Sequence, residues 1–168
     1  MQEIVRGRAW MFGNDINTES IMPTHVLHDV HKAAAECMKF YDPEFAPNAK
    51  PGDFVIAGTN FGNSSSRPAV GAFVAMQLSA VICESAARIF MRNSWNLGFP
   101  TLECEGITEM VNKGDELELD IVTGLVKNLT TNTELQAKKP LEANLERMRV
   151  GGHFEYIKAH RDEIEQVE

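Results

Sequence analysis

The middle of the chain alternates between short apolar runs and helix-like segments, and this alternation constrains the fold more than any other feature. Strands are expected at 53–58, 80–83 and 101–104, and the first two have the length and apolar content of buried strands. Helical patterns separate them at 69–79 and 85–96. Strands that alternate with helices are typical of parallel βαβ units, so the sequence predicts an α/β fold.

The last third follows a different pattern. Residues 115–122 alternate apolar with charged side chains, and Thr123-Gly124 then turns the chain into 125–129, which predicts an antiparallel hairpin. The other expected elements are a first strand at 4–11 and helices at 31–41, 141–148 and 154–160. Together these elements predict one domain over residues 1–168, with a mixed parallel and antiparallel, barrel-like sheet and flanking helices.

Charge and composition exclude several classes of protein. Hydrophobic residues make up 43% of the 168 residues and charged residues 24%, which is ordinary for a folded globular chain. The formal charge of −8 disfavours nucleic acid and anionic membranes as partners, although one well-placed arginine can still bind a small anion. No basic segment followed by an apolar run opens the sequence, so we expect a cytoplasmic protein.

Cysteines and histidines give no metal-site pattern. Cys37, Cys83 and Cys104 are too widely spaced for a zinc or iron–sulfur motif, and we expect them to be reduced and mostly buried. His28 and His31 are three residues apart, but no cluster of carboxylates or cysteines accompanies them. Solvated side chains are therefore the preferred interpretation of both histidines, and no metal site is predicted in this chain.

The segment whose residue types best suit ligand binding or catalysis runs from Gly58 to Arg67. It combines small residues with three consecutive serines and one arginine, directly before a predicted helix that Pro68 opens. Backbone amides, a helix N-terminus and a guanidinium together suit the binding of an anion, and an arginine can hold a carboxylate with two hydrogen bonds. Serines before a helix are also common caps, and both interpretations remain open from residue types alone.

Other phosphate and hydrolase motifs are missing from this loop. It lacks the lysine of a Walker loop and the Gly-x-Ser-x-Gly of a nucleophile elbow. Arg88 and Arg92, four residues apart on a predicted helix, are interpreted as structural partners of carboxylates.

Four motifs take the interpretation further. They lie at 12–19 with Ile21 and Pro23, at 57–67, at 84–93 with 96–100, and at 124–131. The second is similar to the pattern A-G-x-N-F-G-x-G-S-S-R, and together they resemble the small subunits of 3-isopropylmalate dehydratase, free-standing swivel domains of the aconitase superfamily. The resemblance extends over nearly the whole chain.

The resemblance assigns roles by position. Ser65 falls on the base that removes a proton from the carbon beside a carboxylate, and Ser66 on its hydrogen-bonding neighbour. Arg67 falls on the arginine that binds the substrate carboxylate, and Glu19 on an acidic catalytic residue of the opening motif. The resemblance places the remaining substrate-binding residues in the serine loop and in a selector loop at 24–28: Asn63, Ser64, His25, Val26, Leu27 and His28.

The resemblance also implies a heteromeric hydro-lyase that isomerises a 2-hydroxy di- or tricarboxylate by dehydration and rehydration, as in leucine biosynthesis. Such a chain is expected to act only with a large subunit. The large subunit is expected to hold a [4Fe–4S] cluster, while no cofactor is expected in this chain. The expected partners are this subunit and a small carboxylate anion.

Three departures from the family pattern concern the substrate more than the reaction. Ser64 replaces a glycine, Pro68-Ala69 follows the arginine, and His25-Val26 replaces an Arg-Tyr pair. The alternatives are therefore a related small subunit acting on dimethylmalate, citramalate or homoaconitate, and a non-catalytic anion-binding module. A serine hydrolase would need a histidine–acid pair near Ser65, and no motif indicates one.

Overall fold

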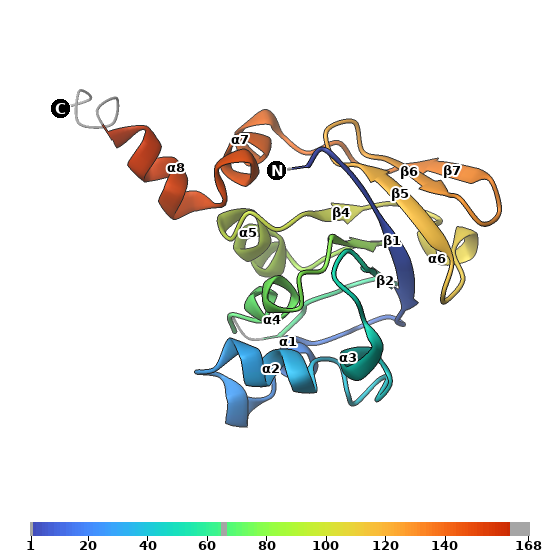
Figure 1. Cartoon of the computed structure of the whole chain (residues 1–168), viewed down its shortest axis with the longest axis horizontal. Coiled ribbons are helices and arrows are strands. Elements are labelled where there is room, and N and C mark those ends of the chain that lie inside the picture. Colours follow the sequence, from blue (N-terminus) through green and yellow to red (C-terminus); the bar gives the residue numbers. More distant parts are fainter. Residues whose placement is uncertain (1, 65–66, 162–168) are drawn as a thin grey trace.

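The fold is built on one mixed sheet of seven strands with helices packed against it (Figure 1). The computed structural model describes residues 2–64 and 67–161. The strand order is β4-β3-β2-β1-β5-β6-β7. The bounds are β1 (Ile4–Met11), β2 (Phe54–Ala57), β3 (Ala80–Cys83), β4 (Thr101–Glu103), β5 (Glu116–Asp120), β6 (Leu125–Asn128) and β7 (Thr133–Gln136).

Strand β1 joins two halves of opposite pairing. Its last residues pair in parallel with β2, where Trp10 lies opposite Val55, and β3 and β4 continue this parallel half. Its first residues pair antiparallel with β5, where Val5 lies opposite Leu119, and β6 and β7 continue that half. The predicted mixed sheet is confirmed, and it curls into a half-barrel with flanking helices.

Short helices follow most of the strands. Helices α2, α4, α5, α7 and α8 form a row in which each contacts the next (Figure 1). The bounds are α1 (Thr18–Ile21), the 3-10 helix η1 (Thr24–Val26), α2 (Val30–Glu36), α3 (Phe45–Asn48), α4 (Val70–Ala75), α5 (Arg88–Asn96), α6 (Ile107–Met110), α7 (Glu142–Val150) and α8 (His153–Ala159). Among the helices of the described residues, none is long and apolar enough to cross a membrane.

Two predicted helices are shorter than expected, and a residue with a left-handed backbone follows each of them. Helix α2 ends at Glu36 rather than at residue 41, since Met38 adopts a left-handed backbone (φ +58°) and donates its N–H to the carbonyl of Ser20. Helix α4 ends at Ala75, and Gln77 adopts a left-handed backbone (φ +57°) just before β3. The third strand of the antiparallel half, β7, was not predicted.

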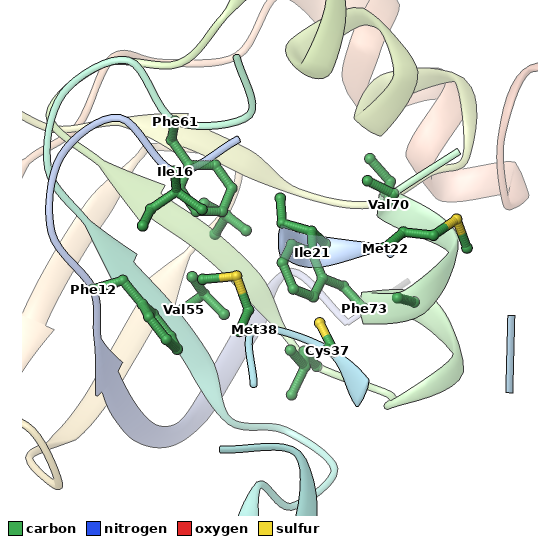
Figure 2. Packing of buried hydrophobic residues seen from close by; sticks show 14 of the residues in the cluster. Phe12, Ile16, Ile21, Met22, Cys37, Met38, Val55, Phe61, Val70 and Phe73 are labelled. Atoms are coloured by element: carbon green, nitrogen blue, oxygen red, sulfur yellow. The ribbon is translucent and has the colours of Figure 1, made fainter. Parts of the chain in front are cut away.

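The core consists of two apolar clusters, one on each face of the parallel strands. All four residues of β2 and all four of β3 are buried, as expected for parallel strands covered on both sides. Val55 belongs to the first cluster and Ile56 to the second. Figure 2 shows the first cluster, in which Ile21 and Met22 pack near Phe73. The loops that carry the sequence motifs are therefore anchored directly in the core.

The three cysteines are free and buried, as predicted. Burial raises the pKa of the Cys37 and Cys83 thiols well above the ordinary range, and it raises that of Cys104 to about 11. Cys37 and Cys83 belong to the first apolar cluster, whereas Cys104 belongs to the second. The three thiols therefore do not converge on a common site.

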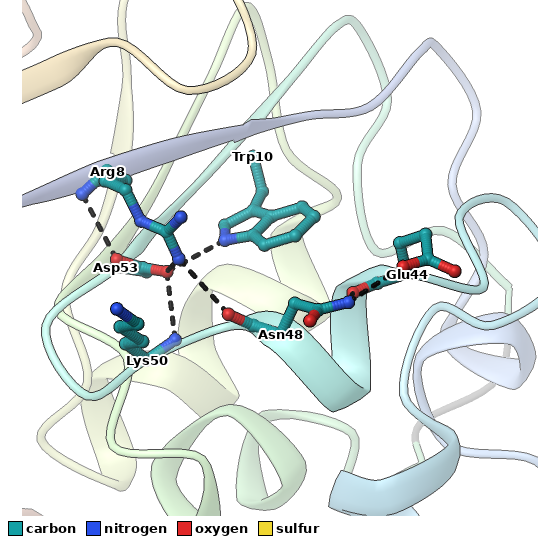
Figure 3. A network of polar contacts seen from close by, with 6 residues as sticks. All are labelled: Arg8, Trp10, Glu44, Asn48, Lys50 and Asp53. Atoms are coloured by element: carbon teal, nitrogen blue, oxygen red, sulfur yellow. Dashed lines mark hydrogen bonds and ion pairs between the residues drawn. The ribbon is translucent and has the colours of Figure 1, made fainter.

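Asp53 anchors the start of β2 against β1 (Figure 3). Its buried carboxylate accepts hydrogen bonds from Trp10 Nε1 at 2.9 Å, from Lys50 N at 2.9 Å, and from both the backbone and the guanidinium of Arg8. Burial alone raises the pKa of this carboxyl, but the hydrogen bonds from Lys50, Trp10 and Arg8 outweigh it and hold the pKa below its ordinary value.

Asp53→Asn is expected to lower the free energy of unfolding by about 3 kcal/mol, because the amide cannot accept all of these hydrogen bonds. Since the pKa of Asp53 is lower in the folded state, its contribution is complete above about pH 4 and is lost as the pH falls through the folded-state value. Urea unfolding between pH 3 and pH 7 measures both effects. Glu155→Gln, at an exposed ion pair with Lys158, is the control. A D53N variant as stable as that control would contradict this role.

Candidate functional site

Three loops meet at the carboxyl ends of the parallel strands, and they contain the first three sequence motifs. The loop after β2 lies between the loops after β1 and β3. Gly62 donates its N–H to the carbonyl of Ile16 at 2.7 Å, and Phe61 donates to the carbonyl of Ser85 at 3.0 Å. The carbonyl of Phe61 in turn accepts from Ala87 N at 2.8 Å. This pairing also explains why α5 begins at Arg88 rather than at the predicted Ser85.

Two glycines of the middle loop are required by packing against protein. A Cβ atom on Gly58 would lie 1.8 Å from Asn14 Oδ1, and one on Gly62 would lie 2.3 Å from Cγ of Phe90. Gly62 also has a φ of +73°. At these two positions the space is filled by Asn14 and Phe90.

Ser64 has a left-handed backbone, with φ of +80°. The family pattern has glycine at this position, and the structure gives the physical reason, because a side chain is disfavoured in this conformation by about 1–2 kcal/mol. Ser64 is exposed, whereas its neighbour Asn63 is half-buried. The amide of Asn63 donates to the carbonyl of Asn60 at 3.1 Å, so it stabilises the loop itself.

Ser64→Gly is expected to raise the free energy of unfolding by about 1 kcal/mol, after the larger entropy of glycine in the unfolded chain is subtracted. Thermal and urea unfolding measure the change. Ser64→Ala keeps the strain and is the matched control. Equal stability of the glycine and alanine variants would show that the backbone of Ser64 is not strained.

Ser65 and Ser66 lie outside the described residues, so their assigned roles stay predictions. The described residues give the start of the next helix. Helix α4 begins at Val70, and its N-cap is Ala69, whose side chain cannot accept a hydrogen bond.

Arg67 and Glu19 come together, although they belong to different motifs. Arg67 Nη2 lies 3.4 Å from Glu19 Oε1. Arg67 Nη1 donates to Thr24 Oγ1 at 2.9 Å and to the carbonyl of Met22 at 3.4 Å. The Arg67 side chain is only 17% exposed, whereas that of Glu19 is 61% exposed. A guanidinium held this way at the edge of the three loops can bind a carboxylate.

The selector loop divides into outward and inward residues. His25 is exposed, and its Nε2 lies 2.9 Å from Glu36 Oε2. His28 is also exposed. Val26 and Leu27 instead pack against the first apolar cluster. Of the four predicted selector residues, the two histidines are therefore the ones that face solvent.

A hollow of about 370 Å³ lies beside Glu19. It is lined by Glu19, Ser20, Pro23, Glu36, Lys39 and Phe40. Lys39 and Phe40 were not predicted as site residues. Their position was obscured because the predicted helix runs through them, whereas the chain leaves helix α2 at Glu36. The Phe40 side chain is 85% exposed, so an aromatic ring stands at this rim.

The predicted partners of Arg88 and Arg92 are not found. Both arginines are exposed on α5, and neither makes an ion pair with a carboxylate within residues 2–64 and 67–161. Glu84, just before them, instead accepts hydrogen bonds from Gly106 N and from Thr108 at the start of α6. Burial raises the pKa of Glu84, but these bonds outweigh it and lower the pKa below its ordinary value.

The spacing of the histidines in the sequence predicted no metal site. In the part of the chain that the structure describes, no group of three or more His, Cys, Asp or Glu side chains is placed to hold a metal ion.

Known proteins match the chain over the same loops. A family model described as the aconitase C-terminal domain matches residues 11–106, which include the three motifs at the site. The isopropylmalate/citramalate isomerase small subunit of Methanocaldococcus jannaschii is 44% identical over 163 residues, covering 94% of this chain and 96% of that protein. The 3-isopropylmalate dehydratase small subunit 2 of Archaeoglobus fulgidus is 42% identical over 160 residues, covering 93% and 96%.

A solved structure shares the whole architecture. The crystal structure of 3-isopropylmalate dehydratase from Methanocaldococcus jannaschii superposes with a TM-score of 0.89 at 34% sequence identity. The superposition covers 97% of this chain and 98% of that one. The similarity therefore includes the antiparallel half of the sheet and the C-terminal helices as well as the site loops.

Proposed function

From the premise that this chain belongs to the aconitase C-terminal domain family and, within it, to the 3-isopropylmalate dehydratase small subunits, we propose that it serves a hydro-lyase. The reaction removes water from a 2-hydroxy di- or tricarboxylate and adds it back at the neighbouring carbon. The observation that best supports this proposal is the largely buried Arg67 beside Glu19, at the edge where the three motif loops meet.

Each site residue has a chemical task in this proposal. Arg67 binds a substrate carboxylate and compensates the negative charge that grows when the neighbouring carbon loses its proton. Ser65 takes that proton as the general base, and Ser66 hydrogen-bonds beside it. Glu19 acts at the same edge, Asn63 and Ser64 shape the loop, and His25 and His28 contact the variable part of the substrate.

A large subunit would complete the site. Relatives are called small subunits, and the three cysteines of this chain are buried in two separate apolar clusters, which does not suit an iron–sulfur ligand set. We therefore assign the [4Fe–4S] cluster to the large subunit, where it would supply a Lewis acid for the substrate hydroxyl.

A panel of candidate compounds tests which substrate the complex accepts. One relative is named for isopropylmalate and citramalate together, so the panel to test holds isopropylmalate, citramalate, dimethylmalate and homocitrate. The chain is co-expressed without oxygen with its large subunit, the cluster is reconstituted, and formation of the unsaturated acid is recorded for each compound.

Turnover of one compound supports the proposal and identifies what the exposed histidines of the selector loop accept. An intact, cluster-loaded complex that turns over none of the four contradicts the proposal and favours an anion-binding module without catalysis.

A further inference from the structure

The Thr24 hydroxyl lies between the two charged groups of the site. It accepts a hydrogen bond from Arg67 Nη1 at 2.9 Å and donates one to Glu19 Oε1 at 2.8 Å. The direct contact between Arg67 Nη2 and Glu19 Oε1 is longer, at 3.4 Å. Within the described residues, Thr24 therefore links the guanidinium and the carboxylate by two hydrogen bonds shorter than their direct contact.

The donor and acceptor roles in these two hydrogen bonds determine the orientation of the Thr24 hydroxyl. A threonine hydroxyl has one hydrogen to donate, and the Glu19 carboxylate can only accept while the Arg67 guanidinium can only donate. The hydrogen therefore points to Glu19 and a lone pair to Arg67. Among the described residues, Thr24 Oγ1 is a closer acceptor for Arg67 Nη1 than the carbonyl of Met22, which lies at 3.4 Å.

Thr24 stands on a well-anchored backbone. It is the first residue of η1, after Pro23, whose φ is −58°. Met22 before it is fully buried, and Val26 after it is 4% exposed. Leu27 N donates to the Thr24 carbonyl and closes the turn. The hydroxyl is thus held in place by core packing, although the side chain itself is exposed.

We propose that Thr24 is a positioning residue, whose hydroxyl orients the guanidinium of Arg67 for the substrate carboxylate and couples it to the selector loop that begins at the same residue. This inference rests on the proposed function, in which Arg67 binds that carboxylate. Thr24 itself does not touch the reacting atoms. Its effect passes through Arg67, so it should alter substrate binding more than the chemical step.

Thr24→Val removes the hydroxyl while it keeps the shape of the side chain, and Thr24→Ser keeps the hydroxyl. In the complex with the large subunit, T24V is expected to raise KM about tenfold with kcat within about twofold of the wild type, as for a lost hydrogen bond to a charged group. T24S is expected to have the KM of the wild type. The matched control is Thr133→Val at the first residue of β7, where the exposed Thr133 hydroxyl forms a hydrogen bond with that of Thr131.

An unchanged KM in T24V, or a KM in T24S as high as in T24V, overturns the proposal. Thr24→Ala repeats the test without the added methyl group. A second measurement does not depend on turnover. Nitrogen NMR of the Arg67 guanidinium in the isolated chain is expected to show slow rotation about its Cζ–Nε bond in the wild type and T24S, and faster rotation in T24V.

The two measurements separate the possible failures. Equal rotation of Arg67 in T24V and the wild type overturns the positioning role of Thr24, whatever the complex catalyses. If the complex shows no turnover, the proposed function is contradicted. Faster rotation of Arg67 in the isolated T24V chain than in the wild type would still support the positioning role of Thr24.

Discussion

Ser65→Ala is expected to leave the chain folded and bound to the large subunit, while kcat falls by about 10²–10⁴-fold, the usual contribution of a positioned general base. The methyl side chain cannot take a proton from carbon, and no neighbouring group replaces it in the proposed chemistry. The measurement is the initial rate of formation of the unsaturated acid by the reconstituted complex. Size-exclusion chromatography of the same sample shows whether the complex is intact.

The matched control for this variant is Ser79→Ala. Ser79 lies at the amino end of β3, whereas the three site loops lie at the carboxyl ends of the parallel strands. Its replacement should not change kcat. An S65A complex with the turnover of S79A would remove Ser65 from the catalytic role and would leave the proposed mechanism without its base.

Arg67→Lys is expected to raise KM by about 10–100-fold, because an ammonium cannot reproduce the paired hydrogen bonds of a guanidinium to a carboxylate. The variant also loses the geometry with which Nη1 donates to Thr24 and Met22. The substrate dependence of the initial rate gives KM and kcat separately. A smaller loss of kcat is expected, since the retained charge still compensates part of the developing negative charge.

Arg6→Lys is the control for this substitution. Arg6 pairs with Glu118 on the antiparallel half of the sheet, and its side chain is 67% exposed. Because Arg6 lies in the part of β1 that pairs with β5, and the site loops follow the carboxyl ends of the parallel strands, its conversion to lysine should not change KM. A KM of R67K equal to that of R6K would show that Arg67 does not bind the substrate.

The middle of the parallel half was predictable because strands β2 and β3 are apolar throughout. Val55 and Ile56 point to opposite faces of β2, and both faces are covered, so an unbroken apolar run is the expected signal. Strand β7 gives no such signal, since Thr133, Glu134 and Gln136 are exposed. Its existence depends on pairing with β6, which is a tertiary property.

The site was predictable only in part. The proximity of Arg67 to Glu19 follows from parallel β1 and β2, which bring both loops to one edge, but spacing alone does not pair two residues so far apart in the chain. The motif resemblance identified both residues. Thr24 lies in the predicted selector loop, but its bridging position 43 residues before Arg67 was not predicted, because sequence spacing does not show which groups its hydroxyl contacts.

Backbone conformation was the other property hidden from the sequence. The replacement of a family glycine by Ser64 was visible, but its left-handed φ of +80° was not. Likewise, the end of α2 depends on the hydrogen bond from Met38 to the carbonyl of Ser20, which lies in α1. Local helix propensity contains no information about such a partner.

The central claim is that this chain completes the active site of a large dehydratase subunit, and one titration tests it most directly. Cluster-loaded large subunit is held at fixed concentration without oxygen, this chain is added in steps, and formation of the unsaturated acid is followed with the best compound of the panel. We expect no turnover without the chain and a rise to a plateau as the two subunits reach a fixed ratio. Turnover by the large subunit alone that the added chain does not change would contradict it.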